Sequence, residues 1–283
     1  MSEQKTPPQA AGVKPESSNL WMRVLAAAVM APLAILLAWA GGWFWAALAT
    51  LAAIGMYVEW LAIVGVAQRS RLAASGVAAL LIAGICLALE RQDGALVVYG
   101  IGLVAVALLT RGDRRWPVSG LFYAAAAQMA AVLVRQDPVW GWSALLFVML
   151  IVWATDIGGY FAGRAIGGPK LWVRVSPKKT WAGAVGGLTG SLIVAAGFAA
   201  SGIGRMASML LLAAVLSVVS QLGDLFESAV KRRFGVKDSS HLIPGHGGVL
   251  DRIDGFVAAI VLAAIIGVLR GGADGVARGL MVW

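Results

Sequence analysis

Residues 145–155 read LLFVMLIVWAT, an uncharged apolar run that leads directly to Asp156. The rest of the chain has the same character: 60% of its 283 residues are hydrophobic, only 13% are charged, and the mean hydropathy is +0.82. A soluble domain carries about a quarter charged residues. The composition therefore predicts an all-α polytopic membrane protein.

Further apolar runs on both sides of this one predict the number of membrane crossings. A helix needs about 20 apolar residues to span a bilayer. About nine transmembrane helices are predicted, over residues 22–40, 43–65, 72–89, 94–110, 117–134, 140–163, 181–203, 206–227 and 250–269. Most of the 23 lysines and arginines fall in loops on the side of the N-terminus. By the positive-inside rule, the N-terminus is predicted to be cytoplasmic and the C-terminus to lie on the opposite side.

The chain divides into three predicted parts. Residues 1–20 are polar and lack the pattern of a signal peptide, so they are expected to form a disordered cytoplasmic tail. Residues 21–139 hold the N-terminal transmembrane helices, a packing or dimer scaffold. Residues 140–283 form the predicted catalytic region, with cytoplasmic loops at 164–180 and 228–249.

Two features of the composition exclude simple alternatives. The single cysteine, Cys86, leaves no disulfide framework and no cysteine-based metal site. A net charge of +9 would suggest nucleic-acid binding in a soluble protein. Here the topology accounts for most of these cations, and no nucleic-acid partner is expected.

Acidic residues near the ends of the apolar runs are the first candidates for function, because ionisable groups within membrane helices are costly. Asp156 and Asp224 each follow an apolar run, and Asp251 and Asp254 share one face at the start of the last helix. Their carboxylates, converging from three helices, would form an oxygen-only site suited to Mg²⁺. The alternative is that these acids pair with adjacent lysines and arginines, which is at least as good an interpretation for Glu59 and Glu227.

The loop at 228–249 combines cations with a glycine-rich turn. Lys231, Arg232, Arg233 and Lys237 can hold phosphate oxygens, although positive-inside bias explains them equally well. The sequence PGHGG at 244–248 leads directly into a helix, where backbone N–H groups and the helix dipole favour an anion. This combination predicts a phosphate-binding loop.

The second polar loop repeats the theme. Ser176 before Pro177 predicts a helix N-cap followed by proline at the first helical position. Lys178, Lys179 and Thr180 would then place phosphate donors beside the first turn. Phosphoryl and nucleotidyl transfer depend on such positioning, charge neutralisation and metal ions more than on covalent catalysis.

Three segments together carry a family resemblance. Residues 228–254, SAVKRRFGVKDSSHLIPGHGGVLDRID, resemble the C-terminal motif of phosphatidate cytidylyltransferases, also called CDP-diacylglycerol synthases. Upstream, WATD at 153–156 and SPKKTW at 176–181 extend the resemblance over residues 140–255. Ala182 departs from it, because many members have an acidic residue at this position.

The resemblance implies a function and its chemistry. CMP passes from CTP to phosphatidic acid, giving CDP-diacylglycerol and pyrophosphate, as the first committed nucleotide-activation step of phospholipid synthesis. It implies dependence on Mg²⁺, with room for a second, monovalent or divalent cation. It also implies a multi-pass protein of the bacterial inner membrane, a homodimer, and an active site that faces the cytoplasm.

Carried onto this chain, the resemblance assigns roles to individual residues. The expected metal ligands are Asp224 and Asp251, assisted by Asp254 and Asp156. Lys231 and Arg252 are expected to act with Asp224 and Asp251 in catalysis. The expected substrate-binding residues are Ser176, Lys178, Lys179, Thr180, Arg232, Lys237, Asp238, His246, Gly247 and Gly248.

Two other classes of function remain open from the residues. An ion-coupled transporter would use the intramembrane acids as a relay, although the chain shows no sign of the two corresponding halves that transporters have. A CTP-dependent lipid or polyprenol kinase would transfer the γ-phosphate instead of the nucleotidyl group.

Overall fold

The protein is a bundle of long helices with one small β-hairpin. The structure, a computed structural model, describes residues 32–66, 70–240 and 247–283. Eight helices in these ranges are long and apolar enough to cross a membrane: α2 (Gly42–Ile63), α3 (Ser70–Ala88), α4 (Gln92–Leu109), α5 (Arg115–Gln136), α6 (Gly141–Ala165), α7 (Trp181–Ala200), α8 (Met206–Arg233) and α9 (Leu250–Gly271). The short elements are β1 (Lys170–Trp172), β2 (Ser176–Thr180), η1 (Ala273–Gly275) and α10 (Val276–Met281). The predicted all-α polytopic class is confirmed.

Most predicted spans agree with α2 to α9 to within a few residues. The first, 22–40, lies largely outside the described residues, of which 32–40 are helical. The predicted tail at 1–20 lies outside them entirely. The count of nine helices, the orientation of the termini and the division at residue 140 therefore stay predictions.

One loop boundary was predicted wrongly. Helix α8 continues to Arg233, so residues 228–233 are helical and the loop begins only at Phe234. Lys231, Arg232 and Arg233 are favourable at this position because cations stabilise the C-terminal end of a helix dipole. Gly235 ends the helix with a φ of +70°, as its N–H bonds to the carbonyl of Arg232.

The predicted N-cap at Ser176 is also wrong. Residues 176–180 form strand β2, which pairs antiparallel with β1. A residue that precedes proline favours extended backbone. Pro177 has no backbone N–H, and an edge strand tolerates this missing donor. The N-cap of α7 is instead Thr180, whose Oγ1 accepts a hydrogen bond from the Gly183 N–H at 3.1 Å.

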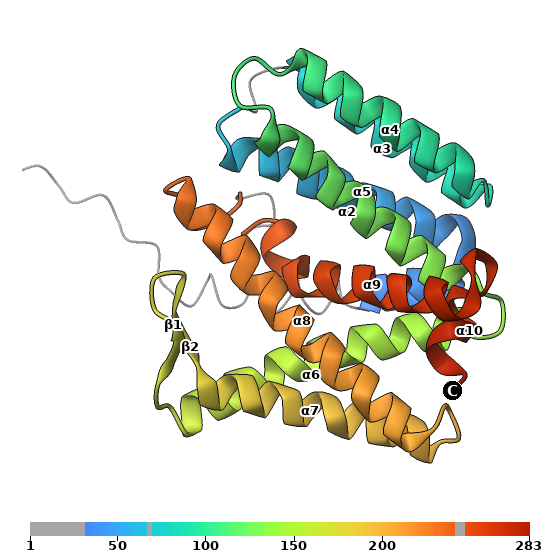
Figure 1. Cartoon of the computed structure of the whole chain (residues 1–283), viewed down its shortest axis with the longest axis vertical. Helices are drawn as coiled ribbons and strands as arrows, with labels where there is room; N and C mark the ends of the chain where they lie inside the picture. Colours follow the sequence, from blue (N-terminus) through green and yellow to red (C-terminus); the bar gives the residue numbers. More distant parts are fainter. Residues whose placement is uncertain (1–31, 67–69, 241–246) are drawn as a thin grey trace, which may run out of the picture.

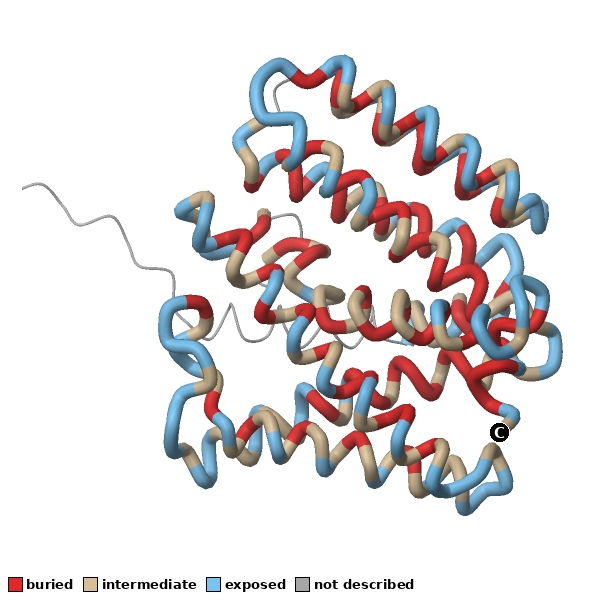
Figure 2. Tube along the Cα trace, in the orientation of Figure 1, coloured by how far each residue is buried: buried red, intermediate tan, exposed pale blue. Residues whose placement is uncertain are grey.

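The helices are arranged in layers, as Figure 1 shows. Helices α3 and α4 form an outer pair, α2 and α5 lie beneath them, α9 and α8 follow, and α6 and α7 form the opposite side. The hairpin β1–β2 projects at the end of the α6–α7 pair. Burial follows this order: α5 is 67% buried within the chain, whereas α4 and α7 are only 22% buried (Figure 2).

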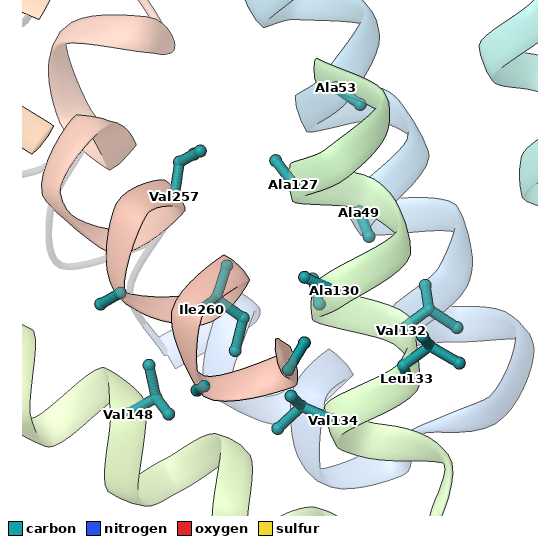
Figure 3. Packing of buried hydrophobic residues seen from close by; sticks show 14 of the residues in the cluster. Ala49, Ala53, Ala127, Ala130, Val132, Leu133, Val134, Val148, Val257 and Ile260 are labelled. Carbon is teal, nitrogen blue, oxygen red and sulfur yellow. The ribbon is translucent and has the colours of Figure 1, made fainter. Parts of the chain in front are cut away.

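The centre of the core is built from small and branched side chains. Val257 and Ile260 of α9 lie opposite Ala127 and Ala130 of α5 (Figure 3). Helices inside lipid gain little from hydrophobic burial and associate through close packing, which small residues permit. This packing fixes α9, and with it the acids at its start, against the N-terminal helices.

Glycines bring α6 and α7 into backbone contact. A Cβ added at Gly158 would lie 2.6 Å from the carbonyl oxygen of Gly186, and one at Gly187 would lie 2.6 Å from that of Thr155. Real Cβ atoms do not approach so closely, so these positions require glycine. The contact holds the Asp156 end of α6 beside the hairpin and the first turn of α7.

Candidate active site

A polar cavity of about 510 Å³ lies between α6, α7, α8 and the hairpin. Carboxylates enter it from Asp156 and Asp224, and cations from Arg164, Lys178 and Lys179. The rest of its lining comes from Thr155, Gly159, Tyr160, Gly163, Leu171, Thr180, Gly183, Ala184 and Gln221. Both charge signs therefore face one space, as a site for a metal-bound polyphosphate would require.

An ion pair spans this cavity. The Nζ of Lys179 lies 2.5 Å from Oδ2 of Asp224, and the two side chains are only 28% and 33% exposed. On its other oxygen, Asp224 accepts a hydrogen bond from the Ser228 hydroxyl at 3.4 Å. The pair joins strand β2 to α8, so the hairpin forms part of the site.

The crossing of α8 and α9 brings a third acid to this position. A Cβ added at Gly223 would lie 2.8 Å from the carbonyl oxygen of Asp254, and one at Gly255 would lie 2.7 Å from the Ser220 hydroxyl. Because the helices meet at these glycines, Asp254 lies near Asp224. Asp156, Asp224 and Asp254 are close enough to repel one another electrostatically.

A second group of charges surrounds Lys231. Its Nζ lies 2.6 Å from Oδ1 of Asp251 and 2.7 Å from Oε2 of Glu227, whose side chain is 2% exposed. The other oxygen of Asp251 accepts hydrogen bonds from the Gly248 N–H at 2.9 Å and the Ser239 hydroxyl at 2.9 Å. The interpretation of Glu227 as the partner of a nearby cation is confirmed. Asp251 is held by protein donors on both oxygens.

The sequence did not predict that Glu59 binds the start of α9 and the loop before it. This residue of α2 is 1% exposed and accepts hydrogen bonds from the backbone N–H groups of Val249 and Leu250, each at 2.8 Å. It also accepts from the hydroxyls of Ser239 at 2.9 Å and Ser240 at 2.7 Å. Its signal in the sequence was a lone acid in an apolar run, but the partners are about 180 residues away in the chain.

The start of α9 was predicted as an anion site, and carboxylates of the protein already bond to it. The Gly248 N–H donates to Asp251, and the next two N–H groups donate to Glu59. Gly247 has a φ of +81°, a conformation that favours glycine. His246, expected to contact substrate, lies outside the described residues.

The remaining predicted residues are spread over the same end of the molecule. Ser176 is half-buried at the start of β2, while Arg232, Lys237 and Asp238 are exposed beyond the polar cavity. Arg232 donates a hydrogen bond to the carbonyl oxygen of Val236 at 3.2 Å. The structure thus brings together Asp156, Lys178, Lys179, Thr180 and Asp224 in one cavity, and Lys231, Gly248 and Asp251 in an adjacent cluster.

An apolar groove of about 410 Å³ begins where the polar cavity ends. Residues from helix 32–40, α2, α5, α6 and α9 line it, and nearly all are alanine, leucine, valine, methionine or aromatic. Its charged lining residues are Asp156 and Arg252. Asp156 lines both spaces, so a charged group at this junction has polar surroundings on one side and apolar surroundings on the other.

Comparison with known proteins places this arrangement in a family. A sequence model described as the cytidylyltransferase family matches residues 21–269. The chain belongs to the cytidylyltransferase family. The matched residues include all the acids described above and the hairpin.

Individual relatives support the same conclusion over most of the chain. The phosphatidate cytidylyltransferase of Brucella melitensis biotype 1 is 43% identical over 260 residues, 89% of this chain and 94% of its own length. The phosphatidate cytidylyltransferase of Pseudomonas aeruginosa is 37% identical over 265 residues, 87% of this chain and 97% of its own. As a member of this family, the protein is an enzyme.

Proposed function

We propose that the protein transfers CMP from CTP to phosphatidic acid and releases pyrophosphate. The observation that carries this proposal is the junction at Asp156, where a polar cavity with cations and carboxylates meets an apolar groove. A reaction between a nucleotide and a lipid needs these two environments to meet at the reacting atoms. The high identity to proteins named phosphatidate cytidylyltransferase supports the choice of substrates.

The triphosphate of CTP fits the cationic wall of the polar cavity. Lys178, Lys179 and Arg164 line it, and Arg164 is oriented by a hydrogen bond from its Nη1 to the Tyr160 hydroxyl at 2.8 Å. Lysine offers a point charge and arginine a planar fork, and both bind phosphate oxygens. Bound phosphate would compete with Asp224 for Lys179.

The lipid fits the groove between α2, α5, α6 and α9. Acyl chains would lie against its apolar walls, and the phosphate would lie near Arg252 at the charged end. An anionic headgroup needs a cation to offset its repulsion by Asp156, and Arg252 is placed to supply it. The two substrates would then approach Asp156 from opposite sides.

The reaction balances without a covalent enzyme intermediate. A phosphate oxygen of phosphatidic acid forms a bond to the α-phosphorus of CTP, and the bond from that phosphorus to the β-phosphate oxygen breaks. Pyrophosphate leaves with the electron pair. Lys178, Lys179 and Arg164 stabilise the charge that develops on the leaving group, because fixed cations in a partly dry site act strongly on such charge.

We further propose that the enzyme depends on Mg²⁺. Carboxylates are the hard oxygen ligands that Mg²⁺ prefers, and it commonly takes one or two of them together with substrate phosphates and water. Within the described ranges, no three acidic, histidine or cysteine side chains form a ready-made metal-binding group. The mutual repulsion of Asp156, Asp224 and Asp254 is nevertheless of the kind that a cation relieves.

Asp224 would be the central ligand in this proposal. Asp254 and Asp156 face the same region, whereas the expected ligand Asp251 would first have to release Lys231 or Ser239 from one of its oxygens. When bound, Mg²⁺ would neutralise phosphate charge. Activity over a Mg²⁺ titration of the Asp251 and Asp254 variants distinguishes these two candidates for the second ligand.

Following the label from CTP into lipid tests the reaction itself. Purified protein in phosphatidic acid micelles should move ³²P from α-labelled CTP into the lipid fraction and leave γ-label in pyrophosphate. Transfer of γ-label instead would identify a lipid kinase and overturn the proposal. Absence of both labels from the lipid, with intact folded protein, would also overturn the proposal.

The location of the site follows from the same proposal. The hairpin, the end of α8 and the start of α9 lie at one end of the bundle (Figure 1), and these segments are rich in lysine and arginine. Under the positive-inside rule this end is cytoplasmic, in a bacterial inner membrane, where CTP is available. The product, an activated phosphatidyl donor, would be consumed by transferases that use an alcohol acceptor. The homodimer stays a prediction.

A further inference from the structure

Glu59 lies outside both cavities, yet it bonds to the segment that carries Asp251. Within the described residues, its carboxylate accepts four hydrogen bonds, two from backbone N–H groups at the start of α9 and two from serine hydroxyls of the preceding loop. All four distances lie between 2.7 and 2.9 Å. Hydrogen bonds to a charged group are stronger than those between neutral groups, so a single side chain of α2 fixes this region.

The surrounding packing is shaped around this carboxylate. A Cβ added at Gly248 would overlap the Ser239 hydroxyl and both oxygens of Glu59, so the backbone approaches the carboxylate as only glycine allows. One turn earlier in α2, Gly55 leaves room for Val249, whose Cγ2 would lie 3.2 Å from an added Cβ. Gly55 in α2 and Gly248 before α9 thus allow α2 and the start of α9 to approach closely enough for the Glu59 contact.

Ser239 connects Glu59 to Asp251. Its hydroxyl oxygen lies 2.9 Å from Oε2 of Glu59 and 2.9 Å from Oδ2 of Asp251. The hydroxyl has one proton, so the two carboxylates share one donor. A change at Glu59 should therefore alter the hydrogen bonding of Asp251, and through it the position of Lys231.

We propose that Glu59 is a positioning residue: its carboxylate occupies the N-terminal anion site of α9 and, through Ser239, orients Asp251 and Lys231. This inference rests on the proposed function for its kinetic consequence. It also explains a feature of the site. Because a protein carboxylate fills the start of α9, the phosphates of CTP are left to the cations of α6 and the hairpin.

The structural part of the proposal is tested independently of activity. Hydrogen–deuterium exchange on full-length protein in detergent should show faster exchange of the Val249 and Leu250 amides in Glu59→Gln, by roughly tenfold or more, since a charge-assisted bond is lost. Thr50→Val is the matched control, because it removes a buried hydroxyl from the same helix, where Thr50 bonds to Gln128. Unchanged exchange at these amides in Glu59→Gln would overturn the proposal.

The kinetic part uses the same variants. Glu59→Gln should lower kcat about 100-fold with a much smaller change in the KM for CTP, because small displacements of catalytic groups act on the reacting geometry. Glu59→Asp, which keeps the charge, should recover part of the loss, and Thr50→Val should match wild type. Equal kcat in Glu59→Gln and wild type would overturn the proposal.

Two further variants keep the test decisive if Glu59→Gln does not fold. Ser239→Ala should lower kcat in the same direction, and in a double-mutant cycle Ser239→Ala with Glu59→Asp should be non-additive, since both act through Asp251. Additive effects would contradict the proposed connection. A wild type that transfers no α-label would refute the proposed function, whereas the exchange result would still decide the role of Glu59.

Discussion

Lys179 of strand β2 and Asp224 of helix α8 form an ion pair with 2.5 Å between Nζ and Oδ2, inside the cavity that also holds Asp156. A partly buried pair of this kind leaves a costly unpaired charge when one partner is removed. The pair also places Lys179 beside the acids Asp156, Asp224 and Asp254. Binding of a triphosphate would transfer this cation from Asp224 to phosphate and free Asp224 for a metal ion.

The first prediction concerns that lysine. Lys179→Met should lower kcat/KM about 100-fold or more, because a cation that stabilises leaving-group charge is lost. Label transfer from α-³²P CTP measures it. Lys170→Met, at an exposed position of the paired strand β1, is the control and should retain wild-type activity. Equal losses in the two variants would mean that the hairpin acts only as a structural element.

The second prediction separates the two candidate metal acids of α9. Asp224→Asn should abolish turnover, and Asp254→Asn should raise the Mg²⁺ concentration needed for half-maximal activity by about tenfold or more, because a ligand oxygen is lost. Asp251→Asn should also abolish turnover, but through misplaced Lys231. Activity measured over a Mg²⁺ titration distinguishes these effects.

The outcome for Asp251 decides between two assignments. If Asp251→Asn shows residual activity that rises with added Mg²⁺ while Asp254→Asn does not, the second ligand is Asp251, as the family resemblance implied. Near-normal activity of Asp251→Asn at ordinary Mg²⁺ would contradict both roles considered for Asp251, as a metal ligand and as the group that positions Lys231. Retention of the folded state is checked for each variant by gel filtration in detergent.

The third prediction tests how the fold supports the cavity. Gly158→Val should destabilise the protein and reduce activity, since its side chain would meet the backbone of Gly186 across the α6–α7 contact. Thermal unfolding in detergent and label transfer measure the two effects. Gly197→Val is the control, because an added Cβ at this α7 position meets nothing within 4 Å. Similar stability of both variants would show that α6 and α7 can separate without cost.

Local sequence patterns were enough to predict the helices and part of the site. Apolar runs predicted the spans because a membrane helix is specified by its own length and hydropathy. The acids stood out because a charged residue next to an apolar run is rare. Asp156 and Asp224 do line one cavity, together with Lys179. Where local signals compete, the prediction failed: Ser176 resembles an N-cap, but the strand pairing of β2 with β1 overrides it.

The rest could not be predicted because it depends on tertiary contacts. Glu59 and Ser239 lie far apart in the chain, and nothing in either segment specifies the other. The glycine-rich sequence before α9 has the pattern of an anion site, and backbone N–H groups at the start of α9 do bond to an anion. The anion within the described structure is a carboxylate from another helix, which only the packing of α2 against α9 could reveal.

The last prediction concerns the lipid side of the junction. Arg252 lines the apolar groove but not the polar cavity among the residues that the structure describes. Arg252→Gln should therefore raise the KM for phosphatidic acid about tenfold or more, as a charge-assisted phosphate contact is lost, and leave the KM for CTP nearly unchanged. Arg114→Gln, an exposed arginine at the start of α5, is the control and should change neither constant. A larger effect of Arg252→Gln on CTP than on lipid would place Arg252 on the nucleotide side, and the groove would lose its assignment to the lipid.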